Sequence, residues 1–286
     1  MIKLVVVGHL AVNKTFTPAG ENIYFGGAAF HVAWAAAQFL PSRSVGIISV
    51  CGRDFDLTPL EKTGVDTSGI SINKNVNSDT FVINETKTDR TFEAKGKLCL
   101  EVSVKPSPAN FKNARFLHLA TAPPTQQLKW IEEINDSFDR DKVLLSSDSF
   151  ELFVRKFPRQ TEKVFSLSDL IFANTEEWQM LNKTKINAPL VLKMGEKGAV
   201  YFNHGKTVFR VGAVKINKII DSVGAGEIVA GVFLAMKILG FTEKEALSSA
   251  CRIASWSLED FGIEHLAKKE KFLRFLYSVK KHRGVI

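Results

Sequence analysis

Cysteine is scarce in this chain of 286 residues, and long apolar runs are missing. The three cysteines, at positions 51, 99 and 251, are far apart, odd in number and free of any CxxC pair. This excludes a disulfide framework or a zinc cluster and fits a reducing compartment. The apolar stretch 228–236 is too short to cross a bilayer. We therefore expect a cytoplasmic globular protein that does not associate with membranes.

The net charge of +8 is concentrated near the end of the chain. Residues 268–283 contain seven Lys or Arg side chains and one acidic side chain, so the rest of the chain is close to neutral. In the same segment Phe272, Leu273, Phe275, Leu276 and Val279 recur at helical spacing. The segment is either a packed final helix with a solvated basic face, or a basic docking surface for RNA or a membrane. Basic and aromatic residues alternate nowhere else, so we do not expect nucleic acid as a partner.

Strand-like and helix-like patterns alternate along the chain. Aliphatic runs at 2–7 and 45–50 have the composition of buried parallel strands, and amphipathic or apolar helices are predicted between the later runs. This alternation predicts an α/β fold with a doubly wound, mostly parallel sheet flanked by helices.

A second, smaller unit is predicted from a change of pattern after residue 66. The strand candidates there alternate polar and apolar residues and are separated by Asn- or Asp-rich turns, which predicts a small antiparallel β lid. We see no linker or internal repeat. The expectation is a single domain over 1–286, with lid segments at about 9–25 and 68–97 inserted in it.

The strongest local signal is the segment DSVGAGE at 221–227, directly before an apolar helical pattern. Gly224, Ala225 and Gly226 leave the first backbone N–H groups of that helix uncovered, and the helix dipole adds positive potential, which makes an anion site. Glu227 would lie beside a bound phosphoryl group and could accept a proton from an attacking hydroxyl. The alternative is a glycine-rich turn whose acids only cap the helix.

This segment resembles the DTxGAGD signature of the ribokinase-like (phosphofructokinase-B type) carbohydrate kinase family. Three further stretches resemble family motifs in the family's order: GGAAFHVA at 26–33 resembles GGxxxNxA, NTEE at 174–177 matches NxxE, and KMGEKGA at 193–199 resembles TLGxxG. The resemblance extends over about residues 2–262 and is closest to archaeal-type sugar or inositol kinases. It implies a ribokinase-like fold.

The resemblance also implies a role for each motif. Glu227 corresponds to the base, and the backbone of Gly224, Ala225 and Gly226 to the anion hole. Asn174 and Glu177 correspond to the pair that organises Mg²⁺, partly through water. The residues implied in nucleotide binding are Asn174, Glu177, Lys193, Gly195, Gly198 and Ser255. The residues implied in acceptor binding are Asn13, Gly26, Gly27, His31 and Asp148.

Several positions differ from the family pattern. Glu227 replaces an aspartate, His31 replaces the asparagine of the Gly-Gly motif, and Lys193 stands where a small hydroxyl is usual. The sugar-binding acid after the first strand is missing, and Asn13 is the nearest candidate. His31 is either a structural histidine or a substrate contact, and Lys193 either contacts phosphate or simply ends a strand.

The expected activity is ATP-dependent, Mg²⁺-assisted phosphorylation of a hydroxyl on a small sugar or cyclic polyol. The alternatives are a nucleoside kinase of the same family, or a degenerate relative that binds nucleotide or sugar with weak or no kinase activity. Asp221 either belongs to a monovalent-cation loop, as in many relatives, or caps the turn. By analogy with family members, a homodimer would form through the lid.

Overall fold

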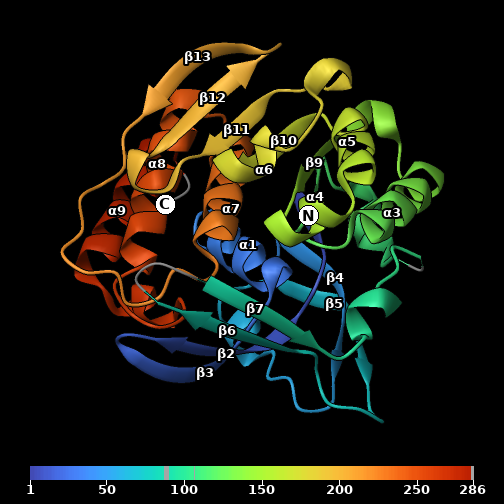
Figure 1. Cartoon of the computed structure of the whole chain (residues 1–286), viewed down its shortest axis with the longest axis horizontal. Coiled ribbons are helices and arrows are strands. Elements are labelled where there is room, and N and C mark those ends of the chain that lie inside the picture. The colour runs from blue at the N-terminus through green and yellow to red at the C-terminus, as the bar shows by residue number, and fades with distance from the viewer. Residues whose placement is uncertain (87–89, 106, 285–286) are drawn as a thin grey trace.

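The computed structural model describes residues 1–86, 90–105 and 107–284. Within these residues nine strands form one large sheet in the order β13-β12-β11-β10-β9-β8-β1-β4-β5 (Figure 1). Strands β11 to β5 of this order pair in parallel, whereas β12 and β13 continue the edge antiparallel. The strand bounds are β1 Leu4–Val7, β4 Val45–Gly52, β5 Asp66–Asn73, β8 Phe116–Leu119, β9 Leu144–Asp148, β10 Leu170–Asn174, β11 Leu190–Lys193, β12 Ala199–Asn203 and β13 Lys206–Val211.

Helices cover both faces of this sheet (Figure 1). One apolar core lies under α1, α7, α8 and α9, and a second lies on the other face, under α3, α4 and α5. The doubly wound, mostly parallel sheet is therefore confirmed. The helix bounds are α1 Ala28–Ala37, α2 Thr58–Lys62, α3 Pro124–Ser137, α4 Glu151–Lys156, α5 Pro158–Ser166, α6 Thr175–Gln179, α7 Ala225–Ile238, α8 Glu243–Ser257 and α9 Glu270–His282.

The second sheet is the lid, which lies below α1 and α7 in Figure 1. Its strands are β2 Ala11–Thr17, β3 Gly20–Gly26, β6 Thr80–Glu85 and β7 Arg90–Lys95, in the order β3-β2-β6-β7. β2 and β3 pair antiparallel, as do β6 and β7, whereas β2 and β6 pair in parallel. Asn13 pairs with both Tyr24 and Phe81. Partners in register project from the same side of a sheet, so these three side chains share one face.

Two parts of the expected lid differ from the structure. Residues 68–73 belong to β5 at the edge of the large sheet, where they pair with β4. All eight residues of β4 are buried, so its backbone groups need a partner on each side, and β5 supplies one. Residues 9–25 contribute two strands, β2 and β3, to the lid, and β2 pairs with β6 in parallel within a sheet that was expected to be antiparallel.

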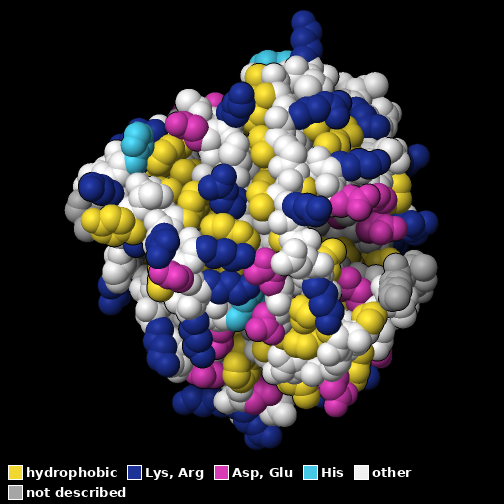
Figure 2. Space-filling view, turned by 90° about the vertical axis from the view of Figure 1, so that its left-hand side faces the viewer, with side chains coloured by type: hydrophobic (Ala, Val, Ile, Leu, Met, Phe, Trp, Pro, Cys, Tyr) yellow, Lys and Arg dark blue, Asp and Glu magenta, His cyan; other side chains and the backbone are white. Residues whose placement is uncertain are grey.

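The basic C-terminal segment forms helix α9, which begins at Glu270 after a short 3-10 helix. Phe272, Leu276 and Val279 of the predicted stripe are buried and Phe275 packs against the core, whereas Leu273 is 50% exposed. Lys269 and Lys271 form ion pairs with Glu259, and Figure 2 shows Lys and Arg interspersed with acidic side chains on the side of the molecule that carries α8 and α9. Packing and local ion pairs therefore account for this helix. No helix within the described ranges has the length and apolar character of a membrane span.

Candidate active site

Three neighbouring parallel strands end in polar residues at one edge of the large sheet. Asp148 ends β9, Asn174 ends β10 and Lys193 ends β11. Side chains at the carboxyl ends of parallel strands converge in doubly wound folds, and ligands bind there. The structure adds α7, because the N-terminal Gly226 of this helix lies against Lys193. Residues from three of the motifs, together with Asp148, thus meet at this edge.

The N-terminus of α7 begins at Gly224, whose φ of 79° is left-handed. No side chain caps this helix, so the N–H groups of its first turn remain available for an anion. A methyl group on Gly224 would lie 2.7 Å from Cγ of His31, and one on Gly226 would lie 3.2 Å from Nζ of Lys193. The expected anion hole therefore lies between an imidazole on one side and an ammonium on the other.

The predicted acceptor residues of the Gly-Gly motif gather on the imidazole side. A side chain on Gly26 would overlap Asn13 Nδ2 and would lie 3.2 Å from Cε1 of His31. Asn13 is 1% exposed, and among the described residues neither its Oδ1 nor its Nδ2 has a hydrogen-bond partner; Nε2 of His31 is likewise unpaired. Buried polar groups are normally paired, so these three atoms are oriented for a ligand.

His31 is uncharged at neutral pH. Burial lowers its pKa, against the opposing effects of the Glu227 and Asp221 charges and of a hydrogen bond to the Gly27 carbonyl. That hydrogen bond uses the protonated ring nitrogen, which leaves Nε2 as an acceptor. The Glu227 charge acts on His31, on Lys193 and on Asp148. Glu227 follows Gly226 in the first turn of α7, the helix that begins between His31 and Lys193.

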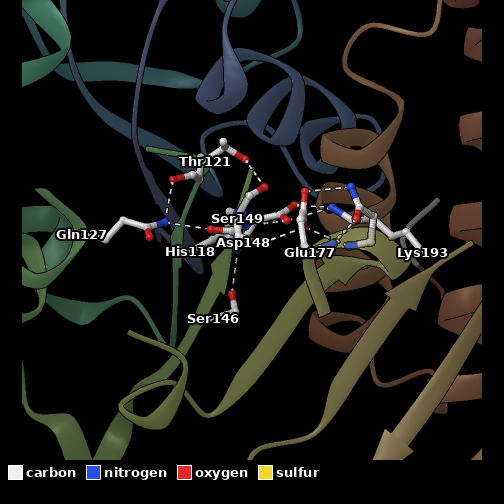
Figure 3. A network of polar contacts seen from close by, with 10 residues as sticks. His118, Thr121, Gln127, Ser146, Asp148, Ser149, Glu177 and Lys193 are labelled. Carbon is white, nitrogen blue, oxygen red and sulfur yellow. Dashed lines mark hydrogen bonds and ion pairs between the residues drawn. The ribbon is translucent and has the colours of Figure 1, made fainter. Parts of the chain in front are cut away.

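Lys193 and Asp148 form an ion pair across the end of β10 (Figure 3). Nζ donates to Oδ1 at 2.8 Å and to Oδ2 at 2.7 Å, and the two side chains are 15% and 1% exposed. Burial raises the pKa of Asp148 to about 7 despite the lysine. Burial alone would lower the pKa of Lys193, but the carboxylates of Asp148, Glu177 and Glu227 outweigh it and raise that pKa.

Asn174 and Glu177 form a capping box at the start of α6. Glu177 Oε2 accepts from the Asn174 N–H at 2.9 Å and from Ser149 Oγ at 2.7 Å, while Oε1 accepts from Asn174 Nδ2 at 2.8 Å. Within the described residues no group of three or more His, Cys, Asp or Glu is arranged to hold a metal. Because Mg²⁺ keeps waters and takes few protein ligands beside phosphates, this engaged pair fits a water-mediated contact with Mg²⁺.

A cavity of about 720 Å³ adjoins the anion hole. Lys193, Gly195, Gly198 and Ser255, all expected at the nucleotide, line it together with Ala225 and Gly226. Asn174 and Glu177 do not line it. Gly198 has φ 86°, and a side chain there would overlap backbone of the 211–213 segment, so only glycine fits the turn.

Sequence reasoning missed one wall of this cavity. Residues 213–219 follow β13 without regular structure and line the cavity opposite Cys251, Ala254 and Leu258 of the α8 region. The run of alternating Lys and aliphatic residues there matches none of the motifs that were recognised. The only signal available was its position, between the last strand and the glycine-rich segment.

Two hydrogen bonds join the lid to the segment before the anion hole. Tyr24 Oη donates to Asp221 Oδ2 at 2.7 Å, and Ser222 Oγ donates to Glu85 Oε2 at 2.8 Å. Asp221 also accepts from the Val223 N–H at 2.9 Å. The carboxylate of Asp221 therefore holds the turn and fastens the lid to it.

We expect Tyr24→Phe to loosen the closed lid. Loss of a hydrogen bond to a carboxylate costs about 1.5–3 kcal/mol, part of which the remaining contact of Ser222 with Glu85 offsets. Acceptor KM should rise roughly 3- to 10-fold with a smaller change in kcat, measured by steady-state kinetics. Tyr277→Phe on the exposed face of α9 is the control. If both variants had the same kinetics, the hydrogen bond from Tyr24 to Asp221 would not hold the lid in place.

Comparison with known proteins adds independent findings. A protein-family profile described as "pfkB family carbohydrate kinase" matches residues 1–269. The chain is 26% identical over 270 residues to a cytidine kinase of Thermococcus kodakarensis, which covers 88% of this chain and 93% of that protein. It is 24% identical over 284 residues to a 2-dehydro-3-deoxygluconokinase of Bacillus subtilis, with 87% and 86% covered.

Solved structures with the same fold include two kinases. A nucleoside kinase of Methanocaldococcus jannaschii superposes with a TM-score of 0.76 at 20% identity and covers 97% of this chain and 99% of its own. A ribokinase of Cryptococcus neoformans, in complex with ADP, gives 0.77 at 18% identity, with 99% and 100% covered. At these identities the likeness concerns the fold alone.

Proposed function

Because the chain belongs to the pfkB family of carbohydrate kinases, we propose that it transfers the γ-phosphoryl group of ATP to a hydroxyl of a small, uncharged, polyhydroxylated acceptor. One observation carries this proposal. The uncapped N-terminus of α7 lies between the unpaired polar atoms of Asn13 and His31 on one side and the Lys193 cavity on the other. An acceptor and a nucleotide bound on these two sides would meet at Glu227.

In the proposed reaction the acceptor hydroxyl oxygen attacks the γ-phosphorus and forms a new O–P bond. The bond between the γ-phosphorus and the oxygen that bridges it to the β-phosphorus breaks, and its electron pair leaves with ADP. Glu227 accepts the hydroxyl proton. The N–H groups of Gly224, Ala225 and Gly226 stabilise the charge on the phosphoryl oxygens.

The nucleotide would occupy the cavity lined by Lys193, Gly195, Gly198 and Ser255. Mg²⁺, when bound with ATP, neutralises charge on the β- and γ-phosphates, and Asn174 with Glu177 would hold its waters. The lid, fastened through Tyr24, excludes bulk water from the transfer step.

A nucleoside is the second candidate acceptor, and an aromatic cluster favours it. Phe81 shares the inner lid face with Asn13, and its ring lies 5.2 Å from that of Phe92. Phe92 in turn contacts Phe150 at 5.1 Å, two residues beyond Asp148. The Phe81–Phe92 pair is tilted and the Phe92–Phe150 pair is edge-to-face, and an aromatic cluster beside polar sugar contacts suits a ligand with a flat base. The name of the Thermococcus relative agrees with this class.

The proposal is tested by measuring ADP release from Mg-ATP with a panel of pentoses, hexoses, inositols and nucleosides, and by identifying the phosphorylated product by mass spectrometry. Turnover with a nucleoside at least tenfold faster than with the free sugar would select the second candidate. Binding of ATP and acceptor without turnover would indicate the degenerate relative considered from the sequence.

Asn13→Ala should weaken acceptor binding without affecting the nucleotide. The amide offers one acceptor and two donor positions to a hydroxylated ligand, and sites built on such hydrogen bonds discriminate strongly. We expect acceptor KM to rise about 10- to 100-fold with the ATP Kd unchanged.

The same substitution removes a buried polar group that lacks a protein partner, so the midpoint of thermal unfolding should not fall. Asn84→Ala, on an exposed position of the lid, is the matched control. A lower melting temperature with unchanged KM would assign Asn13 to structure instead.

A further inference from the structure

The ion pair of Lys193 and Asp148 connects the two halves of the site. Lys193 lines the nucleotide cavity, while Asp148 lies at the end of β9, two residues before the aromatic Phe150. Strand β10 lies between them, so the lysine side chain crosses its end to reach the carboxylate (Figure 3). The contact of its ammonium with Gly226 places a fixed positive charge against the anion hole.

Both carboxylate oxygens of Asp148 accept hydrogen bonds from protein donors. Oδ1 accepts from Lys193 Nζ and from the Ser149 N–H at 2.8 Å, Oδ2 accepts from Lys193, and the side chain is 1% exposed. The backbone oxygen of Asp148 accepts from Gln127 Nε2 at 2.9 Å, which fixes the end of the strand. The two bonds to Nζ and the burial of the carboxylate indicate that Asp148 holds Lys193 in place.

We infer that Lys193 is a catalytic residue that donates its third N–H to the transferred phosphoryl group, and that Asp148, which accepts from Nζ, is its positioning residue rather than an acceptor ligand. The inference rests on the proposed kinase function and deepens it. Lys193 keeps its proton throughout, while the acceptor proton goes to Glu227 and the electron pair of the broken bond goes to ADP. The ammonium stabilises the negative charge that develops on the phosphoryl oxygens in the transition state.

Both halves of the inference follow from side-chain physics. An ammonium on a four-carbon chain has many rotamers, and a partner is needed to hold it in one. Asp148 supplies that partner from the opposite side of β10, and Glu177 and Glu227 add negative charge that keeps the lysine protonated. Gly226 gives the ammonium room to approach the backbone, because a side chain there would meet Nζ.

The experiment compares four variants: Lys193→Met, Lys193→Arg, Asp148→Asn and the control Lys197→Met. Lys197 is exposed, lies four residues away and does not line the cavity. For each, kcat and acceptor KM are measured with the best acceptor, and the Kd values of ATP and of ADP are measured by titration calorimetry. The ratio of the two Kd values reports contact with the γ-phosphate independently of turnover.

Lys193→Met should lower kcat about 10²- to 10³-fold and weaken ATP binding about tenfold more than ADP binding. Lys193→Arg should retain at least about a tenth of kcat, since it keeps the charge. Asp148→Asn should lower kcat roughly 10- to 100-fold and reduce the preference for ATP in the same direction, with acceptor KM within about threefold. Lys197→Met should match the wild type.

Two results would overturn the inference while leaving the kinase function standing. One is a Lys193→Met variant whose kcat lies within threefold of wild type. The other is an Asp148→Asn variant that raises acceptor KM but keeps the ATP preference, which would make Asp148 an acceptor ligand. If wild type turns over no acceptor, the proposed function fails, and the ATP-to-ADP ratio still decides the lysine contact. If a single variant does not fold, the Lys193→Met/Asp148→Asn double variant, which leaves no unpaired buried charge, takes its place.

Discussion

Glu227→Gln should lower turnover by about 10²- to 10⁴-fold with acceptor KM little changed. The substitution keeps the shape of the side chain but removes its ability to accept the hydroxyl proton, and general-base contributions have this magnitude. The measurement is phosphoryl transfer from Mg-ATP to the acceptor that wild type uses best. Glu132→Gln, an exposed change on α3, is the control. A Glu227→Gln variant with more than half of wild-type turnover would refute the assignment.

Glu227→Asp asks whether the site is built for the longer side chain. His31 lies beside the anion hole where the family pattern has asparagine, and the Glu227 charge acts on it. If the backbone and the imidazole set a distance that only glutamate can span, the carboxylate of the shorter aspartate lies about 1 Å from the position at which glutamate acts. A displacement of that size can cost about 10²-fold. We therefore expect kcat to fall, and equal or faster turnover would show that the spacing suits aspartate.

Gly224→Ala should have the second large effect. A left-handed φ of 79° costs an alanine roughly 1–2 kcal/mol, and the new methyl group would lie 2.7 Å from His31. Overpacking of this kind adds about 1–3 kcal/mol. Relief of the clash would displace the anion-hole backbone, so we expect turnover to drop at least about 10²-fold. The free energy of unfolding, from urea denaturation, should fall by the sum of the two costs.

Gly240→Ala is a matched control for this change. Gly240 ends α7 with φ 82°, and no other atom lies within 4 Å of its added methyl group, so it should show the backbone cost alone, with normal kinetics. In the Gly224→Ala/His31→Ala double variant the overpacking disappears, and the combined loss of stability should be smaller than the sum of the single losses. Strict additivity would mean that His31 does not set the space at Gly224.

The sequence predicted the sheet well where strands are continuous and buried. β1 is an uninterrupted run of Leu and Val, and β4 is buried along its whole length although Gly and Ser interrupt its aliphatic residues. The sequence pattern did not reveal strand β2. Asn13 and Thr15 occupy its buried positions, and polar residues at buried positions give the same pattern as a loop. The sequence pattern also placed residues 68–73 in the lid, since an edge strand of the large sheet shows the same polar alternation as a lid strand.

The motifs predicted those features of the site that depend only on residues adjacent in the sequence. The glycine-rich segment 221–227 and the NxxE pair determine by themselves an uncapped helix N-terminus and a capping box, because each depends on local backbone conformation. Family membership follows from their order along the chain.

The tertiary structure alone decided the pairings between motifs. Lys193 and Asp148 are separated by 45 residues, His31 comes to lie between Gly26 and Gly224, and Tyr24 reaches Asp221 from the lid. Periodicity records which face a residue occupies but not which long side chain crosses a neighbouring strand. That choice depends on the order of the strands in the sheet and on the space left by glycines. Lys193, expected at the phosphates, and Asp148, expected at the acceptor, therefore form one buried ion pair with each other.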